Sequence, residues 1–351
     1  MCSVGLGFNF EMDVYTHSIL SQTKKIDRRY AGTLSLVLLS VAFCLTLIFA
    51  LDPIYELLRE PLLSLIEIID PSPQNENAVR ETVSMLASII LSALAILLPT
   101  LPLCLTRRRT PKAVCASPSK KPDVNIFAYI PFAIGMGYFA SLAANILFGE
   151  TSRFIETEAG FLPSTIPGTI LYFVYIAVLP AIAEEIMFRG VVMGALMPYG
   201  RTQALVISAV LFGLTHVNPI QAIFATAMGL LIGELYAQTG SIWWGALIHF
   251  LNNAISSAVT YLLQIYGEDD IIVLGMFGLV VLAIMTFAIA YGTVLVVRAN
   301  KKRRLVDLAP PPDGSYRTLR DAAKQLLGRS AYATAMFCAA YAISLISRYY
   351  Q

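Results

Sequence analysis

The stretch Leu179-Pro-Ala-Ile-Ala-Glu-Glu-Ile-Met-Phe-Arg-Gly190 decides how this chain must fold, because it places three charged side chains inside an apolar run long enough to cross a membrane. One charge at the centre of a spanning helix costs about 2.5–3.5 kcal/mol, so Glu184, Glu185 and Arg189 need partners or a wet cavity. Glu185 and Arg189 are four residues apart and can pair on a helix. Glu184 points about 100° away from Glu185 and is free to meet another group.

The whole chain has the composition of a polytopic membrane protein. Of its 351 residues, 57% are hydrophobic and only 14% are charged, and the mean hydropathy is +0.68. This predicts an all-α transmembrane bundle of about eight spanning helices. The net charge of +2 gives no indication of a nucleic-acid partner, and membrane lipid is expected instead. The five cysteines show no CxxC spacing and are expected to be reduced.

Apolar runs and basic segments divide the chain into five parts. These are a polar N-terminal segment, three spans with their loops, a core of four apolar helices, one further span and a basic tail, at residues 1–30, 31–165, 166–265, 271–297 and 298–351. The individual spans are expected at residues 31–51, 82–105, 126–148, 166–197, 202–216, 220–237, 242–263 and 271–297, with an acidic outer loop after the first. The run 331–347, about 17 residues long, is marginal for a ninth.

Basic residues set the predicted orientation. They cluster just before residue 31, after residue 106 and after residue 297, whereas the segments at the other ends of the spans are acidic. Cytoplasmic loops of membrane proteins accumulate Lys and Arg, so we expect a multi-pass protein of the cell membrane with a cytoplasmic N-terminus.

Two of the three histidines lie in the apolar core, His216 and His249. If the helices on either side of the turn at residues 198–201 form an antiparallel hairpin, Glu184 and His216 lie at the same depth. His249 and Asn253 are one turn apart and face a common point.

The depth of His249 is harder to reconcile with this arrangement. It follows the turn at residues 238–241 by only about nine residues, or roughly 14 Å, so that turn must lie inside the protein or its helix must tilt. Trp243 and Trp244 argue against a buried turn, because tryptophans favour the membrane interface.

Three motifs carry a family resemblance. Glu184-Glu185-xxx-Arg189, Phe212-xxx-His216 and His249-xxx-Asn253 occur in that order on separate hydrophobic helices. They resemble the motifs of the CPBP family, which includes the type II CAAX prenyl endopeptidases and bacteriocin-immunity proteins. The resemblance covers residues 166–265.

The resemblance implies an intramembrane endopeptidase of the glutamate type that needs no cofactor. Its substrate would be a membrane-associated protein or peptide, either of the prenylated CAAX type, as for eukaryotic relatives, or without a prenyl group, as in the peptide processing of bacterial relatives. Glu184 and His216 would activate water, while His249 and Asn253 would stabilise the oxyanion; Glu185, Arg189 and Phe212 would support them. The residues permit this chemistry on their own, since a carboxylate level with an imidazole can hold and deprotonate a water. Donors near the attacked carbonyl would then stabilise the developing negative charge.

Other readings of the same residues stay open. Glu184, His216 and His249 are also a catalytic zinc set with an open fourth position, although no His-Glu-xx-His helix is present. Intramembrane carboxylates and histidines equally make proton relays, so a transporter or a non-catalytic membrane scaffold is the alternative of a different class. Glu234, near a helix end, is expected to snorkel to the surface.

The charge pattern also predicts how the site is reached. Both turns of the core, at residues 198–201 and 238–241, fall on the basic side. We therefore expect the site to open toward the cytoplasmic leaflet.

Overall fold

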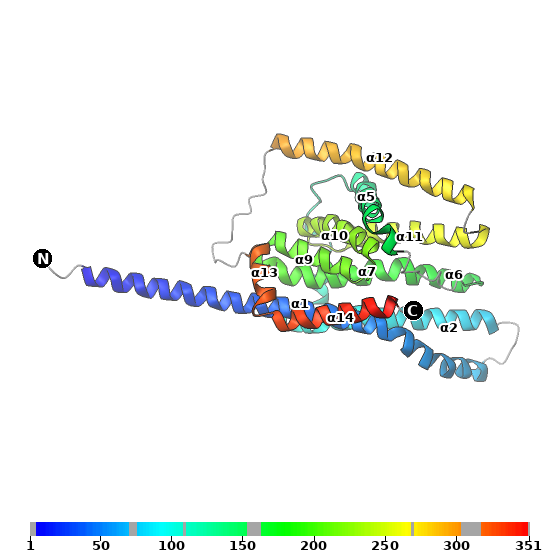
Figure 1. Cartoon of the computed structure of the whole chain (residues 1–351), viewed down its shortest axis with the longest axis horizontal. Helices are drawn as coiled ribbons and strands as arrows, with labels where there is room; N and C mark the ends of the chain where they lie inside the picture. Colours follow the sequence, from blue (N-terminus) through cyan, green and yellow to red (C-terminus); the bar gives the residue numbers. More distant parts are fainter. Residues whose placement is uncertain are drawn as a thin grey trace.

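The fold is a bundle of helices (Figure 1). The structure, a computed structural model, describes residues 5–69, 76–107, 110–152, 163–267, 270–302 and 317–349. Every regular element in these ranges is helical, and seven helices are long and apolar enough to cross a membrane. The prediction of an all-α polytopic bundle is confirmed. Figure 1 shows most helices running roughly parallel, with α5 crossing the bundle and α13 lying across one end.

The N-terminal part forms the first three spans. Its helices are α1 (Gly5–Ile69), α2 (Glu76–Leu97), α3 (Leu101–Arg107), α4 (Pro111–Val114) and α5 (Ile126–Ser152). A 3₁₀ turn at Leu98–Thr100 joins α2 to α3, and Pro99 within it accounts for the interruption, because proline cannot donate to the helical ladder.

The core begins with one long, irregular span. It runs through α6 (Ile166–Phe173), a π-helical stretch (Val174–Val178), α7 (Leu179–Glu185), a second π-helical stretch (Ile186–Met193), α8 (Gly194–Leu196) and a 3₁₀ turn (Met197–Tyr199). The remaining helices are α9 (Arg201–Leu214), α10 (Pro219–Thr239), α11 (Trp243–Tyr266), α12 (Ile271–Lys302), α13 (Leu319–Leu327) and α14 (Ala331–Tyr349).

The first helix is longer than expected. The acidic loop predicted from residue 52 is instead helical as far as Ile69, with Pro53 and Pro61 inside the helix. Its acidic residues lie at intervals of four, four and seven positions, at 52, 56, 60 and 67, among leucines and isoleucines. That spacing is a helical period, and it was misread as a loop because the acidic residues were taken only as a topology signal. The predicted loop residues Asp70, Glu156 and Glu158 lie outside the described residues.

Two predicted membrane helices are short. α9 has 14 residues, and α14 holds an apolar stretch at Ala331–Ile346, below the length of the seven spans. The chain leaves α9 after Leu214 and turns at once into α10. The side chain of Asn218 caps α10 by accepting from the backbone N–H groups of Ile220 and Gln221, and Pro219 occupies the first turn.

The turn at residues 238–241 is buried within the protein. Thr239 is 0% exposed and Ser241 1%. The linker between α4 and α5 covers this turn, since the backbone N–H and the hydroxyl of Ser119 both donate to the Thr239 carbonyl, at 3.0 and 2.9 Å. The Trp243 indole donates to the carbonyl of Cys115 at 3.2 Å. This places His249 deep in the bundle, and the argument from the tryptophans against a buried turn was wrong.

Glu81 of α2 anchors the start of the long core span. Its carboxylate accepts from the backbone N–H and hydroxyl of both Ser164 and Thr165, over 2.5–3.0 Å. These donors precede α6, whose N-cap is Thr165. A carboxylate at a helix N-terminus also suits the helix dipole. The contact fixes the depth at which α6 and α7 enter the bundle.

The C-terminal helices fold back on α1. α14 lies beside α1 in Figure 1, and the Ser330 hydroxyl donates to the Ala31 carbonyl at 3.0 Å. Arg317 pairs with Asp27 at 2.8 Å. The end of the bundle that carries the basic segments is therefore bound together by contacts between distant parts of the chain.

Single cysteines in a cysteine-free background test the orientation. Thr202, at the start of α9, and Tyr266, at the end of α11, are exposed at opposite ends of the core. Because the basic end should be cytoplasmic, a membrane-impermeant thiol reagent should label Tyr266→Cys in intact cells and Thr202→Cys only after permeabilisation. The reverse pattern would contradict the orientation.

Candidate active site

A buried ion pair organises the site. Arg189 Nη1 lies 2.8 Å from Glu185 Oε1, and both side chains are 0% exposed, so the predicted pairing is confirmed. The guanidinium carbon of Arg189 lies 4.5 Å from the centroid of the Phe212 ring, in cation–π geometry. None of the guanidinium nitrogens has a well-aligned hydrogen bond among the described residues, so charge and ring stacking hold the arginine.

Glu184 differs from its neighbour by facing a cavity. Its side chain is 20% exposed, whereas that of Glu185 is fully buried. The two residues end α7, and the helix then widens into the π-helical stretch Ile186–Met193. Such widenings are frequent at functional sites. The side chains of Glu184 and Glu185 therefore lie in different surroundings, as predicted from the angle of about 100° between successive residues of a helix.

His249 lies between the two carboxylates. Its Nε2 is 3.8 Å from Glu184 Oε2, and its Nδ1 is 3.6 Å from Glu185 Oε1. The ring also packs edge-on against Phe212, with centroids 5.6 Å apart. The sequence analysis had paired His249 with Asn253, and with Glu184 and His216 in the zinc alternative. The contact between His249 and Glu185 was not foreseen, because it depends on the buried turn before α11.

His216 lies at the end of α9, one turn after Phe212. Its Nδ1 is 3.0 Å from the Phe212 carbonyl, and because a carbonyl only accepts, Nδ1 carries the proton in this contact. The imidazole and the Phe212 ring meet edge to face with centroids 5.2 Å apart. In a neutral ring, Nε2 is then the nitrogen that can accept a hydrogen bond.

Asn253 contacts the carbonyl of Ile176 across the site. The Asn253 Nδ2 donates to this oxygen at 3.4 Å, and its Oδ1 accepts from Asn252 Nδ2 at 3.3 Å. Residue 180 is proline, so it has no N–H to donate to the Ile176 carbonyl four residues earlier. The sequence analysis did not name Asn252 as a site residue, although its position directly before Asn253 could have indicated that it lies near the site.

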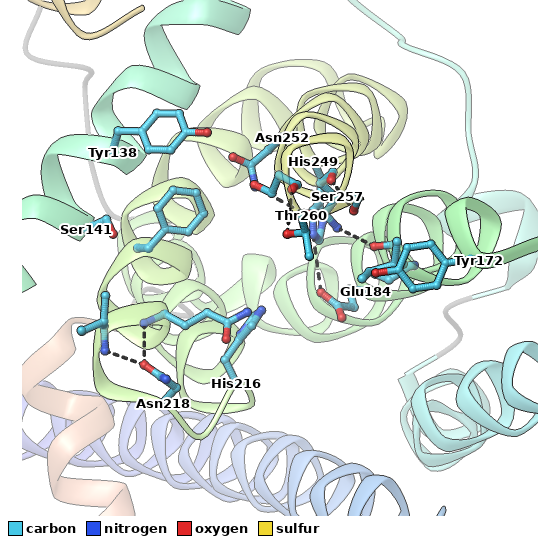
Figure 2. A pocket seen from close by; sticks show the side chains of 17 residues that line it. Tyr138, Ser141, Tyr172, Glu184, His216, Asn218, His249, Asn252, Ser257 and Thr260 are labelled. Atoms are coloured by element: carbon cyan, nitrogen blue, oxygen red, sulfur yellow. Dashed lines mark hydrogen bonds and ion pairs between the residues drawn. The ribbon is translucent and has the colours of Figure 1, made fainter. Parts of the chain in front are cut away.

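A cavity of about 680 Å³ joins these residues (Figure 2). Glu184, His216, His249 and Asn253 all line it, so the structure brings together the four predicted catalytic residues. Of its 17 lining residues, all but Ile176, Pro180, Ile220 and Phe224 carry a polar group. Figure 2 shows Tyr138 and Ser141 on one side of the cavity and Tyr172 on the other. The lining therefore combines many hydrogen-bonding groups with apolar surface.

The cavity lies toward the acidic end of the bundle. Along the long core span its lining runs from Glu184 back to Tyr172, and along α11 it runs from His249 on to Thr260. Both directions lead away from the basic segments, toward the start of α6 and the end of α11. The prediction of an opening toward the basic side was wrong, because it used the distance of each residue from its turn and took no account of the linker that covers one turn.

Among the described residues, no three His, Cys, Asp or Glu side chains come together in a way that could hold a metal ion. Glu234 forms an ion pair with Arg201 and accepts from Gln238 Nε2 at 2.9 Å, which gives it a structural role. The Glu234 side chain is 35% exposed, as expected of a residue that reaches the surface from a helix end.

Comparisons with known proteins agree with the motif residues. Residues 166–255 match the family described as Type II CAAX prenyl endopeptidase Rce1-like. A protein of Bacillus subtilis (strain 168) named "Putative membrane peptidase YdiL" is 28% identical over 158 residues, which are 40% of this chain and 63% of that protein. The match therefore spans less than two thirds of the relative's length. No solved structure matches the chain. The matches support the assignment to the CPBP family, so the resemblance is confirmed.

Removing one partner of the ion pair should destabilise the fold. Arg189→Ala leaves Glu185 charged and buried, and we expect a loss of about 3–5 kcal/mol, seen as a lower unfolding temperature in detergent. The matched control is the double variant Glu185→Gln with Arg189→Met, which removes both charges and should recover much of the loss. An Arg189→Ala protein as stable as the wild type would contradict a structural role for the pair.

Proposed function

We propose that this chain is an intramembrane endopeptidase in which Glu184 activates a water molecule to attack a peptide bond within the polar cavity. The observation that carries the proposal is the unequal environment of the two glutamates. Glu185 is committed to Arg189, while Glu184 faces the cavity together with His216 and His249. The matches to a prenyl endopeptidase family and to a membrane peptidase support this class of reaction.

Hydrolysis begins with a water molecule held between Glu184 and the His216 imidazole. Glu184 takes a proton from the water as a general base, and the resulting hydroxide attacks the carbonyl carbon of the substrate. His216 Nε2 is suited to hold the same water, because Nδ1 is occupied by the Phe212 carbonyl. Glu184 then gives its proton to the amine that leaves when the C–N bond breaks.

The oxyanion formed by this attack needs hydrogen-bond donors. We assign that role to His249 and Asn253, which line the same cavity one helical turn apart. One N–H of the Asn253 amide contacts the Ile176 carbonyl, which leaves its second N–H for the substrate. Phe212 keeps this arrangement rigid by packing against Arg189, His216 and His249 at once.

The proposal does not require a cofactor. Water activation by a carboxylate supplies the nucleophile, and the side-chain donors stabilise the charge. The substrate class is a membrane-associated protein or peptide. Whether it carries a prenyl group is a property of the substrate that the catalytic residues leave open.

Glu184→Gln should abolish peptide cleavage while leaving the fold intact. We expect a rate at least 100-fold lower, in the range attributed to general bases, because the amide cannot take the proton. Purified wild-type and variant protein in detergent would be incubated with a peptide pool, prenylated and unprenylated, and the products read by mass spectrometry. The unfolding temperature of Glu184→Gln should equal that of the wild type.

Glu185→Gln is the matched control, since it lowers stability by disturbing Arg189. Full activity in Glu184→Gln together with an inactive but stable Glu185→Gln protein would exchange the two roles. No cleavage by the wild type in any condition would favour the scaffold or transporter alternative.

Metal removal tests the zinc alternative separately. After dialysis against 1,10-phenanthroline and EDTA, the cleavage rate should be unchanged, and added Zn²⁺ should not raise it. Loss of activity on chelation with recovery on addition of zinc would instead support a zinc-dependent version of the protease.

A further inference from the structure

We propose that Met228 and Gly137 decide which substrate side chain fits beside the catalytic histidines: a pocket bordered by Met228 takes a small apolar side chain and excludes an aromatic one. This inference rests on the proposed peptidase function and extends it to a residue next to the cleaved bond. Gly137 lies on α5, outside the segment that matches the endopeptidase family. Three observations carry the inference: the place of the pocket, its size, and the close approach of α5 behind its wall.

The pocket adjoins the catalytic cavity. His216, His249 and Asn253 line both spaces. Under the proposed function these three side chains hold the water and the oxyanion, so they surround the carbonyl of the bond that is cut. A side chain that enters the pocket therefore belongs to a residue directly next to that bond. Neighbouring side chains of an extended peptide point to opposite sides, so only one of the two flanking residues fills the pocket.

Much of the pocket wall is apolar. One phenylalanine of α9 and four residues on one face of α10 form this part of the lining: Phe212, Phe224, Ala225, Met228 and Ile232. Ala225, Met228 and Ile232 are only 2%, 3% and 1% exposed. A charged side chain would lose its hydration against such a wall, whereas an apolar one gains free energy there.

The pocket is small. Its volume is about 60 Å³, whereas the catalytic cavity measures about 680 Å³. A buried apolar cavity that holds a benzene ring measures about 150 Å³. The pocket therefore has room for the few carbons of an alanine or valine side chain, but an aromatic ring or a prenyl chain enters only if the walls move. Size is thus the property by which the pocket discriminates.

Gly137 lies directly behind the pocket wall. A Cβ at residue 137 would come within 2.7 Å of Phe224 Cε2 and 3.0 Å of Met228 Cγ. Gly137 itself lines neither cavity, so it meets these two side chains from their far side. The next residue, Tyr138, packs against Phe224 with ring centroids 6.1 Å apart, and Figure 2 shows it at the edge of the catalytic cavity. Glycine at residue 137 lets α5 pack here without pressing the wall into the pocket.

Two substitutions change the pocket in opposite senses. Met228→Ala removes part of the wall and enlarges the pocket. Gly137→Ala adds a methyl group that must push Phe224 or Met228 toward the pocket, and so makes it smaller. Because the expected effects are opposite, either variant decides the question if the other does not fold.

Each substitution has a matched control on the same helix. Leu235→Ala makes a comparable deletion in α10, at a residue that is 0% exposed and lines neither cavity. Gly135→Ala adds the same methyl group to α5, but its Cβ would meet Ala288 and Ile284 of α12. Both controls disturb packing to a similar degree without touching the pocket.

The measurement is the preference for side-chain size. Peptides that the wild type cuts in detergent would be varied through Gly, Ala, Val, Leu and Phe at each residue flanking the cut, and kcat/KM read by mass spectrometry. At one of the two positions the wild type should prefer Ala or Val over Phe by at least about tenfold. Met228→Ala should raise kcat/KM for Leu or Phe relative to Ala by about tenfold, and Gly137→Ala should lower it for Val relative to Gly by a similar factor. The double variant should return toward the wild-type preference.

Ratios within one variant do not depend on how much of the protein is folded. Preferences that stay the same in both variants, or that shift equally in Leu235→Ala and Gly135→Ala, would overturn the inference while the peptidase function stands. The same peptides with a farnesyl or a methyl thioether test a lipid as the occupant. If the variants alter only the choice between these thioethers, the pocket holds the lipid and the inference fails. If the wild type cuts no peptide at all, the proposed function fails and the inference fails with it.

Discussion

The Glu185–Arg189 pair is the constraint on which the rest of the site depends. Two opposite charges with 0% exposure offset each other inside a hydrophobic bundle, and Phe212 holds the guanidinium from the next helix. Removing two charges from water costs free energy, so a buried ion pair does not by itself show that the fold is stabilised. The pair instead determines where other side chains lie. Because Glu185 is paired with Arg189, Glu184 alone faces the cavity. Phe212 fixes the spacing of the two histidines.

Irregular backbone in the long core span links this pair to the opposite wall. Two π-helical stretches flank α7, and Pro180 near its start leaves the Ile176 carbonyl without its usual helical donor. In the structure that carbonyl meets the Asn253 amide from α11. The contact joins the long core span to α11 across the cavity. Backbone groups left free inside a membrane protein are tolerated where such partners or water exist.

Local patterns predicted most of the fold and the membership of the site. The i, i+4 spacing of Glu185 and Arg189 was sufficient to predict their pairing, and the motif helices were each found within a few residues. Features that depend on contacts between distant segments were not predictable. The turn before α11 is buried because a linker more than a hundred residues earlier covers it, and no local pattern encodes that contact. Ser256 and Thr260 look like ordinary helix residues until α5 and α6 are placed opposite them. The extension of α1 past Leu51 could have been found, because its acidic residues already had a helical period.

Val114, Gly190 and Ile242 pack closely together on the basic side of the site, and this dry layer also has an electrical consequence. A potential difference across a membrane falls mainly over the layer that water does not enter. A wet cavity on one side of a dry, interlocked layer would thin that layer and concentrate the field within it. A unit charge that crosses the full potential changes in energy by about 2.3 kcal/mol per 100 mV. Glu184 lines the cavity, so with water filling that cavity its charge and that of an arriving peptide would cross little of this field. The site would then work at nearly the same rate in a polarised and in a depolarised membrane.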